Sequence, residues 1–599
     1  MLPGAFLTVS VALSAVGPAG ALERLDFRVA GDGGADLAET LRGASLLVAS
    51  ELDGQDDAQD LFAAARAEYG RLLGALYAEG RYSGVISIRI DGREAAGIAP
   101  LDAPDRIDVI EVRVDPGPAF RLSEARIVPL APGTDLPAGF APGQPALSGI
   151  VREAAAAGVE GWRDAGHAKA AVAAQDVTAD HASATLAARI GLEPGPRLRF
   201  GPLSVTGAER MRERRIVKIA GLPEGEVFSP EELDRAAERL RRTGVFRSVT
   251  LTEAERVMAP DLLPITATVV EEKPRRFSFG GEIASTEGLS LTGYWLHRNL
   301  MGGAERLRVD AEVTNLGAQT SGVDYALGVT LERPATFTPD TTVDISAEVG
   351  HQDEVDYSAD VGTLGIGATH YFTDALTGRI GLDYEYAEGR DRLDRFLFRN
   401  VSIPLGVTWD RRNDRTDATQ GWYIDAEVKP FFGLGTTGSG TRGTLDARGY
   451  LGFGAEDRFV LAGRVQAGII LGSALLETPR DDLFYSGGGG TVRGQPYQSL
   501  GVQVGRGLLS AKIGGSHFLG AQIEARTKVT ERIGLVGFYD VGRIDVGEFF
   551  GTAGDWHSGA GIGLRYDTGF GPIRLDVAAP VGGTTGDGVQ IYVGLGQAF

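Results

Sequence analysis

Cysteine is absent from this 599-residue sequence. That absence excludes disulfide bonds, thiol nucleophiles and metal sites with cysteine ligands. The seven histidines are scattered, and none has the H-E-x-x-H or paired-histidine spacing of a catalytic metal site. Lone serines and paired acids lack the order and context of a catalytic triad. We therefore predict no catalytic residue, no metal site and no cofactor, and we expect that the protein is not an enzyme.

Long apolar runs are missing beyond the first 21 residues, where no window approaches the 18 uninterrupted apolar residues of a spanning helix. A membrane location would therefore require a β-barrel. Positive charge is also scarce, because 59 basic residues face 80 acidic ones, and this balance argues against nucleic acid as a partner. Glycine is abundant, with 86 residues and no collagen-like period, which favours a β-rich chain with many turns.

Residues 1–21 have the pattern of a secretion signal. The apolar stretch Ala5–Val16 has the length of a signal core, and Ala19-Gly20-Ala21 supplies a cleavage site. Lysine and arginine are missing from the positive end that such a signal usually has. We predict a signal peptide at residues 1–21 and a mature chain that starts near Leu22.

Residues 22–274 contain a weak repeat of about 80 residues, typical of repeated domains. Each copy has a helix that ends in glycine before a strand, at Gly80, Gly166 and Gly244, and the last two are 78 residues apart. In the third copy, Ser229-Pro230-Glu231-Glu232 predicts a capped helix start. We predict three α+β domains of β-α-α-β-β order, at residues 22–121, 122–200 and 201–274.

From residue 275 onward the helical periodicity disappears, and short strands of alternating apolar and polar residues follow. Leu307–Val313 and Ile573–Val577 are examples. Alternation of this kind is the signature of a transmembrane antiparallel β-barrel. The 325 residues from 275 to 599 would supply about twenty for each of sixteen strands, so we expect sixteen. A large soluble β protein is the alternative.

Repeated β-α-α-β-β domains before a barrel resemble the BamA/TamA superfamily, in which POTRA domains precede an outer-membrane barrel. Several further stretches are similar to motifs of that family. They are the turn His297–Gly303, expected between the first two barrel strands, the turn Asp410–Gly421, the loop motif Ser486–Gly494, the strand motif Phe538–Gly542, the penultimate strand Gly569–Asp576 and terminal Phe599, which resembles an insertion signal.

The resemblance implies that the loop carrying Val492, Arg493 and Gly494 folds back into the barrel lumen. An aromatic residue usually follows this motif, whereas here Gln495 and Pro496 precede Tyr497. Because arginine stays charged, a buried Arg493 needs an acceptor. Asp540 could provide it from an inward-facing position in the anchoring strand that contains Phe538, Asp540 and Gly542. The alternative is that Arg493 faces luminal water.

The last strand must pair with the first, near Phe277–Ile283, to close the barrel. Along Gln590–Phe599 we expect Ile591, Val593, Leu595 and Phe599 to face outward, and Tyr592, Gly594, Gly596 and Ala598 inward. Glycine weakens a strand, so Gly594 and Gly596 predict a weak seam that opens laterally and offers a strand edge to a client. The alternative is that these glycines relieve crowding in the lumen.

The resemblance implies an outer-membrane protein assembly factor that inserts or translocates clients such as autotransporters through this seam. Three repeats, without an evident plug helix, favour the TamA branch. A BamA-like general insertase and a two-partner secretion translocator are the alternatives. The implied partners are a TamB-like protein anchored in the inner membrane, unfolded outer-membrane proteins and the lipid bilayer, without nucleic acid. The implied location is the bacterial outer membrane, with the repeats in the periplasm.

Overall fold

The computed structural model of the protein describes residues 22–30, 34–55, 57–285, 288–318, 321–505, 510–551, 554–568, 571–586 and 588–599. The predicted signal peptide and the motif residues Gly569 and Phe570 lie outside this part of the chain. Two compact units are present. One contains the described residues up to Gly201 with Pro223–Glu232 and Glu255–Leu263; the other contains Pro202–Leu222, Leu233–Ala254 and Pro264–Phe599.

The first domain packs helices against a four-stranded sheet of order β1-β4-β2-β3. Leu61, Leu72 and Leu76 of the longest helix are fully buried, as the helical spacing of its apolar residues predicts. The elements are β1 (Arg24–Val29), α1 (Gly34–Ala44), α2 (Leu46–Leu52), α3 (Ala58–Ala78), β2 (Val85–Ile90), β3 (Arg93–Glu94), the short 3₁₀ helices η1 (Ala95–Gly97) and η2 (Pro100–Asp102), and β4 (Val109–Asp115).

Glu68 of α3 is buried in the core of the first domain. Its Oε2 accepts a hydrogen bond of 2.7 Å from the backbone N–H of Leu46, at the start of α2, whereas Oε1 has no partner among the described residues. Burial raises the pKa of the Glu68 carboxyl, and the hydrogen bonds it accepts at the start of α2 oppose only part of that rise. The folded domain therefore binds a proton at Glu68 more readily than the unfolded chain does.

We expect the first domain to be more stable at pH 5 than at pH 7. A raised carboxyl pKa contributes stability that is fully present below the unfolded-state pKa and is lost as the pH rises through the folded-state pKa. Glu68→Gln should remove this pH dependence, and Glu79→Gln, at an exposed position just after the same helix, should keep it. Hydrogen-exchange protection of α3 in the full-length protein measures the effect. Equal pH dependence in wild type and Glu68→Gln would contradict it.

The second domain has one helix where the repeat predicts two. Its elements are β5 (Arg121–Val128), α4 (Ser148–Asp164), β6 (Ala171–Asp180) and β7 (Thr185–Glu193), with sheet order β5-β7-β6. The segment between β5 and α4 contains five prolines, which remove backbone donors and interrupt helical hydrogen bonding. The strict β-α-α-β-β order is therefore wrong for this copy, and the first copy has a third helix and an added short strand.

The third domain follows the predicted order. Its elements are β8 (Arg199–Thr206), α5 (Glu213–Ala220), α6 (Pro230–Arg242), β9 (Phe246–Glu253) and β10 (Leu262–Glu271), with sheet order β8-β10-β9. The predicted cap is present, because Ser229 Oγ accepts a hydrogen bond from the N–H of Glu232 at 3.5 Å. Gly244 after α6 has a φ of 66°, a conformation that favours glycine.

Arginines of α5 and α6 contact a turn of the barrel, residues 334–340, within the second unit. Arg215 Nη2 donates to Pro334 O at 2.7 Å, and Arg239 forms a two-bond fork on Asp340, at 2.9 and 2.7 Å. Arg242 donates to Asp340 at 3.0 Å and lies 3.9 Å above the ring of Tyr371. Burial alone would raise the pKa of the Asp340 carboxyl, but the hydrogen bonds from Arg239 and Arg242 hold it below its usual value. These bonds fix α5 and α6 to the barrel.

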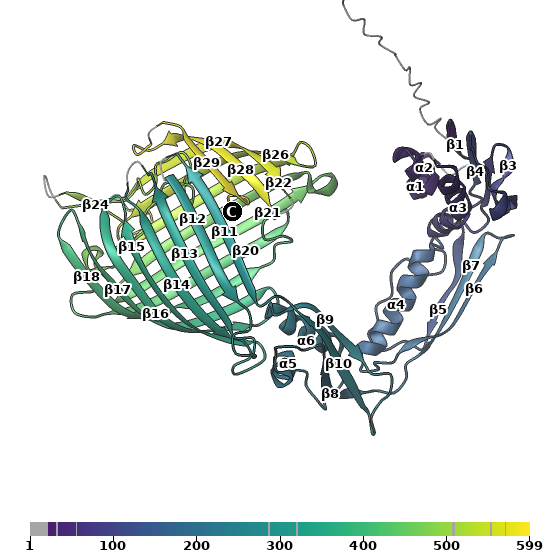
Figure 1. Ribbon diagram of the computed structural model, residues 1–599, viewed down its shortest axis with the longest axis horizontal. Helices are drawn as coiled ribbons and strands as arrows, with labels where there is room; N and C mark the ends of the chain where they lie inside the picture. Colours follow the sequence, from purple (N-terminus) through teal and green to yellow (C-terminus); the bar gives the residue numbers. More distant parts are fainter. Residues whose placement is uncertain are drawn as a thin grey trace, which may run out of the picture. The chain divides into compact units, whose positions relative to one another are not determined.

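A closed antiparallel barrel forms the remainder of the chain (Figure 1). It has sixteen strands among the described residues, as predicted, because β18 and β19 are two segments of one strand that both pair with β17 and β20. The break falls at Ile403 and Pro404, and proline has no backbone donor for a ladder. The segments are β11 (Arg275–Ala284), β12 (Gly288–His297), β13 (Arg306–Leu316), β14 (Asp324–Arg333), β15 (Thr341–Asp353), β16 (Tyr357–Tyr371), β17 (Leu376–Asp391), β18 (Arg395–Ser402), β19 (Leu405–Asp410), β20 (Gly421–Gly433), β21 (Gly440–Phe453), β22 (Phe459–Leu471), β25 (His517–Lys528), β26 (Ile533–Asp545), β27 (Asp555–Asp567), β28 (Pro572–Gly582) and β29 (Gln590–Leu595).

The barrel strands expose apolar side chains and bury charged ones. Along β28, Ile573 and Leu575 are 44 % and 39 % exposed, whereas Asp576 is fully buried. This arrangement is the inverse of a soluble protein and suits a lipid exterior around a polar lumen. Among the helices of the described residues, none combines the length and the apolar character needed to cross a membrane.

The turn His297–Gly303 lies between the second and third barrel strands, β12 and β13. Our expectation that it joins the first two strands is therefore wrong. The first strand, β11, already begins at Arg275, directly after the third domain, and ends at Ala284 before the next turn. Asp410–Gly421 does form the turn before a strand that begins with glycine, since β20 starts at Gly421.

Candidate lateral seam and luminal loop

A long loop joins β22 to β25, and its described residues, 472–505 and 510–516, fold into the barrel. It contains the 3₁₀ helix η4 (Leu475–Glu477) and a short hairpin of β23 (Val502–Val504) and β24 (Ala511–Ile513). A further 3₁₀ helix, η3 (Ala455–Asp457), precedes β22. Val492 and Arg493 of the loop between β22 and β25 are buried, and Arg493 is only 1 % exposed. The structure therefore does not place Arg493 in open luminal water.

Arg493 forms a fork on Asp540 of β26. Its Nε donates to Asp540 Oδ2 at 2.7 Å and its Nη2 to Oδ1 at 2.9 Å, while the backbone N–H of Arg493 also donates to Oδ2 at 3.1 Å. Two parallel bonds between a guanidinium and a carboxylate give both energy and a fixed orientation. The structure thus brings together the two residues that the sequence paired as donor and acceptor.

The other motif residues shape the space around this fork. Phe538, Asp540 and Gly542 alternate along β26 and so face the same side of the sheet. Arg493 lies 3.6 Å above the centre of the Phe538 ring, a cation–π contact. A side chain at Gly542 would meet Ser486 Oγ at 2.3 Å, and one at Gly494, whose φ is 87°, would meet the Ala579 backbone at 2.7 Å. Both glycines are needed for the loop to approach the wall.

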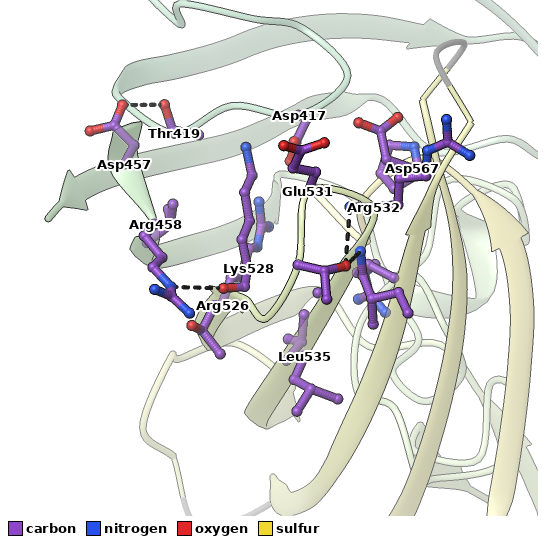
Figure 2. Close-up of a pocket in the computed structure, with 18 of the residues that line it drawn as sticks. Asp417, Thr419, Asp457, Arg458, Arg526, Lys528, Glu531, Arg532, Leu535 and Asp567 are labelled. Carbon is purple, nitrogen blue, oxygen red and sulfur yellow. Dashed lines mark hydrogen bonds between the residues drawn. The ribbon is translucent and has the colours of Figure 1, made fainter. Parts of the chain in front are cut away.

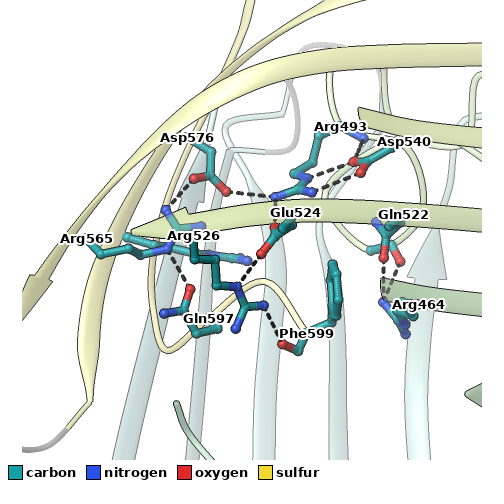
Figure 3. A network of polar contacts seen from close by, with 12 residues as sticks. Arg464, Arg493, Gln522, Glu524, Arg526, Asp540, Arg565, Asp576, Gln597 and Phe599 are labelled. Atoms are coloured by element: carbon teal, nitrogen blue, oxygen red, sulfur yellow. Dashed lines mark hydrogen bonds and ion pairs between the residues drawn. The ribbon is translucent and has the colours of Figure 1, made fainter. Parts of the chain in front are cut away.

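Arg493 also donates hydrogen bonds to two further carboxylates, and the sequence analysis predicted neither of them. Arg493 Nη1 donates to Glu524 Oε1 of β25 at 2.6 Å and to Asp576 Oδ2 of β28 at 3.2 Å (Figure 3). Both carboxylates are fully buried. Their inward position could be predicted from alternation on β25 and β28, because each lies between exposed apolar residues. The register of the strands, which places carboxylates from β25, β26 and β28 around one arginine, could not be predicted from the sequence.

Gln495 occupies the position after the glycine of the loop motif. Its side chain is fully buried and donates to the backbone carbonyls of Ser558 and Gly582, at 2.7 and 3.1 Å. Tyr497 lies elsewhere, with its hydroxyl donating to Glu354 Oε1 at 3.2 Å. Gln495 therefore takes part in loop anchoring at the place where an aromatic residue was expected.

Ion pairs also hold the beginning of the loop to another part of the wall. Arg480 Nη2 lies 2.9 Å from Asp391 of β17, and Asp482 accepts a hydrogen bond from Lys429 of β20 at 2.7 Å. All four side chains are largely buried. The loop is therefore anchored both to β25–β28 and to β17–β20.

The seam between β11 and β29 is held by few main-chain pairs. β11 pairs with β12 along ten residues, whereas the described residues pair it with β29 at two positions, Ile283↔Val593 and Ala284↔Tyr592. One further bond runs from the N–H of Ser285 to Ile591 O, at 3.0 Å. In the described part of the chain, β11 from Arg275 to Glu282 has no main-chain partner on its seam side. The predicted pairing region was Phe277–Ile283, and only Ile283 of it pairs.

This unpaired edge is apolar on its outer face. Phe277 and Phe279 are 64 % and 84 % exposed and therefore face the lipid side of the barrel. A side-chain contact between Arg574 of β28 and Glu282 of β11 crosses the seam. An edge with free donors and acceptors, beside a seam held by two pairs, is a template for strand addition.

The predicted seam glycines have different surroundings. A side chain at Gly594 would meet Arg574 Nε at 3.0 Å, which fits the alternative that this glycine relieves crowding in the lumen. Gly596 has a φ of 92° and follows the end of β29. The alternation ends with the strand at Leu595.

Phe599 faces inward, and our expectation that it faces outward is wrong. The turn at Gly596 directs residues 597–599 into the lumen, where the Phe599 ring packs with Ala418, Tyr450 and Ala462. Arg526 Nη2 of β25 donates to Phe599 O at 3.1 Å. The physical reason is the left-handed backbone at Gly596, which the alternation pattern does not reveal.

A pocket lies beside this tail, between the turns at one end of the barrel (Figure 2). Asp417, Arg458, Arg526 and Asp567 line it together with apolar residues of β26. Charges of both signs therefore face the pocket. The described residues contain no group of three or more histidine, aspartate or glutamate side chains that could hold a metal ion.

Two family models match the chain. One, described as the Omp85 superfamily domain, matches residues 299–599, just over half of the sequence. The chain belongs to the Omp85 superfamily. The other model, described as a surface antigen variable number repeat (POTRA), matches residues 198–272, the third domain of this Omp85 protein.

Two solved structures share the fold of this Omp85 protein. BamA from Haemophilus ducreyi lacking POTRA domains 1–3 is 17 % identical, with a TM-score of 0.61 over 80 % of this chain and 100 % of that chain. CdiB from Acinetobacter baumannii is 11 % identical, with a TM-score of 0.51 over 80 % of this chain and 90 % of that chain. The fold is thus POTRA domains followed by an outer-membrane barrel, with the POTRA domains in the periplasm. Because β11 directly follows the third POTRA domain, the barrel end that carries Arg275 faces the periplasm.

Proposed function

We propose that this Omp85 protein is a non-enzymatic assembly factor of the TamA type, which inserts or translocates client outer-membrane proteins through the seam between β11 and β29. The observation that carries the proposal is the seam, where Arg275–Glu282 of β11 have no main-chain partner on the seam side among the described residues. A client strand can add to this edge through main-chain hydrogen bonds, whatever its side chains are. The action breaks no covalent bond, so no catalytic residue or cofactor enters it.

A partner that bridges to the inner membrane would bind the POTRA domains. β6 of the second domain supports this idea, because it is a strand of ten residues, nearly all exposed, and β7 is its one partner among the strands that the structure describes. The proposed partner is a TamB-like protein. Its copurification with the chain, in place of assembly lipoproteins, would distinguish the TamA role from that of a BamA-like insertase. A two-partner secretion translocator is less well supported, because that class usually carries two POTRA domains and a plug helix.

A photoreactive residue at Phe279 should crosslink to a client during insertion. The client is an unfolded autotransporter barrel added to vesicles that contain the protein, and the product is detected on a gel. The matched control is Leu327, an exposed residue of β14 whose main chain is paired on both sides. We expect crosslinking at Phe279, little at Leu327, and none with a client that is already folded. Equal crosslinking at the two positions would contradict strand addition at β11.

A further inference from the structure

Buried side chains join the luminal loop to the tail that follows the seam strand. Glu524 accepts from Arg493 through Oε1 and from Arg526 Nε through Oε2, at 2.6 and 2.8 Å, and Arg526 Nη2 then donates to Phe599 O (Figure 3). We call Arg493, Glu524, Arg526 and Phe599 the first route. Its members form an unbroken series of hydrogen bonds from the loop to the tail.

A second route runs in parallel through β28. Asp576 accepts from Arg493 Nη1 at 3.2 Å and from Arg565 Nη1 at 2.5 Å. Arg565 Nε donates to Gln597 Oε1 at 2.8 Å, and Gln597 Nε2 donates to Asp417 at 2.9 Å. Both routes therefore end on residues 597–599, directly after Leu595 of β29, and both begin at the same guanidinium of the loop.

The buried charges around Arg493 balance only while the loop is in place. Glu524, Asp540 and Asp576 are fully buried carboxylates. They face three guanidinium groups that are more than nine-tenths buried, those of Arg493, Arg526 and Arg565. The loop supplies only Arg493. If the loop withdraws, three carboxylates remain with two guanidinium groups, and a buried charge without compensation is costly.

The remaining arginines have donors available for a second arrangement. Arg526 Nη1 and Arg565 Nη2 are buried and have no hydrogen-bond partner among the described residues. Without Arg493, Oε1 of Glu524 is free. Arg526 Nε already donates to Glu524 Oε2, so a turn of the guanidinium that brings Nη2 to Oε1 would form the same two-bond fork that Arg493 makes on Asp540. That rotation takes Nη2 away from Phe599 O. The tail would lose the hydrogen bond that holds it.

We infer that these two routes form a latch, by which the luminal loop controls the tail of the seam strand. With the loop in place, Arg526 and Arg565 hold residues 597–599 inside the barrel. Withdrawal of the loop turns Arg526 toward Glu524 and releases Phe599, so that the tail and β29 are less firmly held at the seam. The effect of the latch on client insertion rests on the proposed function, whereas the coupling of loop and tail can be tested without any client.

The test measures how fast a cysteine at Ala598 reacts with a water-soluble maleimide. The natural chain has no cysteine, so Ala598→Cys gives a single site, which is half-buried beside Phe599. We expect Arg493→Ala to raise the labelling rate roughly tenfold, within the range of coupling between interacting residues. In a Glu524→Gln/Asp576→Asn background the same change should have little effect, because Glu524 and Asp576 no longer carry the negative charge that draws the arginines away from the tail.

A second cysteine and a second loop variant keep the test decisive. Ala375→Cys lies half-buried in the turn between β16 and β17, away from both routes, and its labelling should not change. The heat-dependent gel shift of the barrel reports whether Arg493→Ala folds. If it does not, Arg493→Lys replaces it in the test and should give a labelling rate between that of wild type and the rate expected for Arg493→Ala. The latch is refuted if Ala598→Cys labels at the wild-type rate in both variants, or if Ala375→Cys accelerates equally. Such a result would leave the proposed function standing, because client crosslinking at Phe279 tests it separately.

Discussion

A disulfide across the seam is expected to abolish client insertion. Ile283→Cys with Val593→Cys joins two residues that lie directly opposite each other in β11 and β29, and the chain has no other cysteine to compete. Among the described residues, two residue pairs and one further main-chain bond close the seam, so a covalent bond at one of these pairs prevents β11 and β29 from separating. We expect insertion of an unfolded client into vesicles to fall to the spontaneous level when the bond is oxidised, and to recover on reduction.

The matched control is a cysteine pair in a fully paired part of the barrel. Ile345→Cys and Ile366→Cys are opposite each other in β15 and β16, with similar exposure to lipid. A disulfide there stiffens the barrel without closing an edge, so insertion should continue. Client insertion that survives oxidation of the seam pair would show that the client does not use this opening, and lateral insertion at β11 would then be wrong.

Alternation predicted the barrel because its physical cause is local. Each strand must show lipid on one face and the lumen on the other, so Ile573, Leu575 and Asp576 reveal their faces from sequence alone. Asp540 was likewise expected at an inward-facing position, in a strand identified by its resemblance to a family motif. Strand number followed from length, since each strand and its connection need about twenty residues.

Interruptions of the regular pattern were harder to predict. Five prolines replace one helix of the second domain, and the strand that contains Pro404 is divided into β18 and β19. Both breaks could be found from sequence by attention to proline. The inward turn of Phe599 could not, because glycine at position 596 permits a positive φ but does not require it.

The site was predicted in part, and the missing part depends on register. Arg493 and Asp540 were paired because a buried guanidinium needs an acceptor. Glu524 and Asp576 lie 31 residues after and 83 residues after Arg493, on different strands. Which inward carboxylates meet one arginine is fixed by the alignment of β25, β26 and β28, and a one-residue shift would send each to the lipid face.

Substitution of Arg493 by alanine should destabilise the barrel by about 3–5 kcal/mol, the usual cost of breaking a buried ion pair by removing one partner. Arg493 contacts three buried carboxylates, so its loss removes the fork on Asp540 and leaves three negative charges facing two guanidinium groups. Unfolding by urea in detergent, followed by the heat-dependent gel shift, measures the change. Arg532→Ala, which removes an exposed arginine in the turn before β26, should change the stability by less than about 0.5 kcal/mol.

Rescue by a second substitution separates lost charge from lost packing. Asp540→Asn in the Arg493→Ala variant removes one uncompensated carboxylate and should recover part of the stability, so the two effects will not add. Arg493→Lys should be less stable than wild type, because an ammonium group cannot form the planar fork that the guanidinium makes on Asp540. If Arg493→Ala unfolds at the same urea concentration as Arg532→Ala, Arg493 does not anchor the loop. The contacts of Arg480 and Lys429 must then hold the loop in the lumen instead.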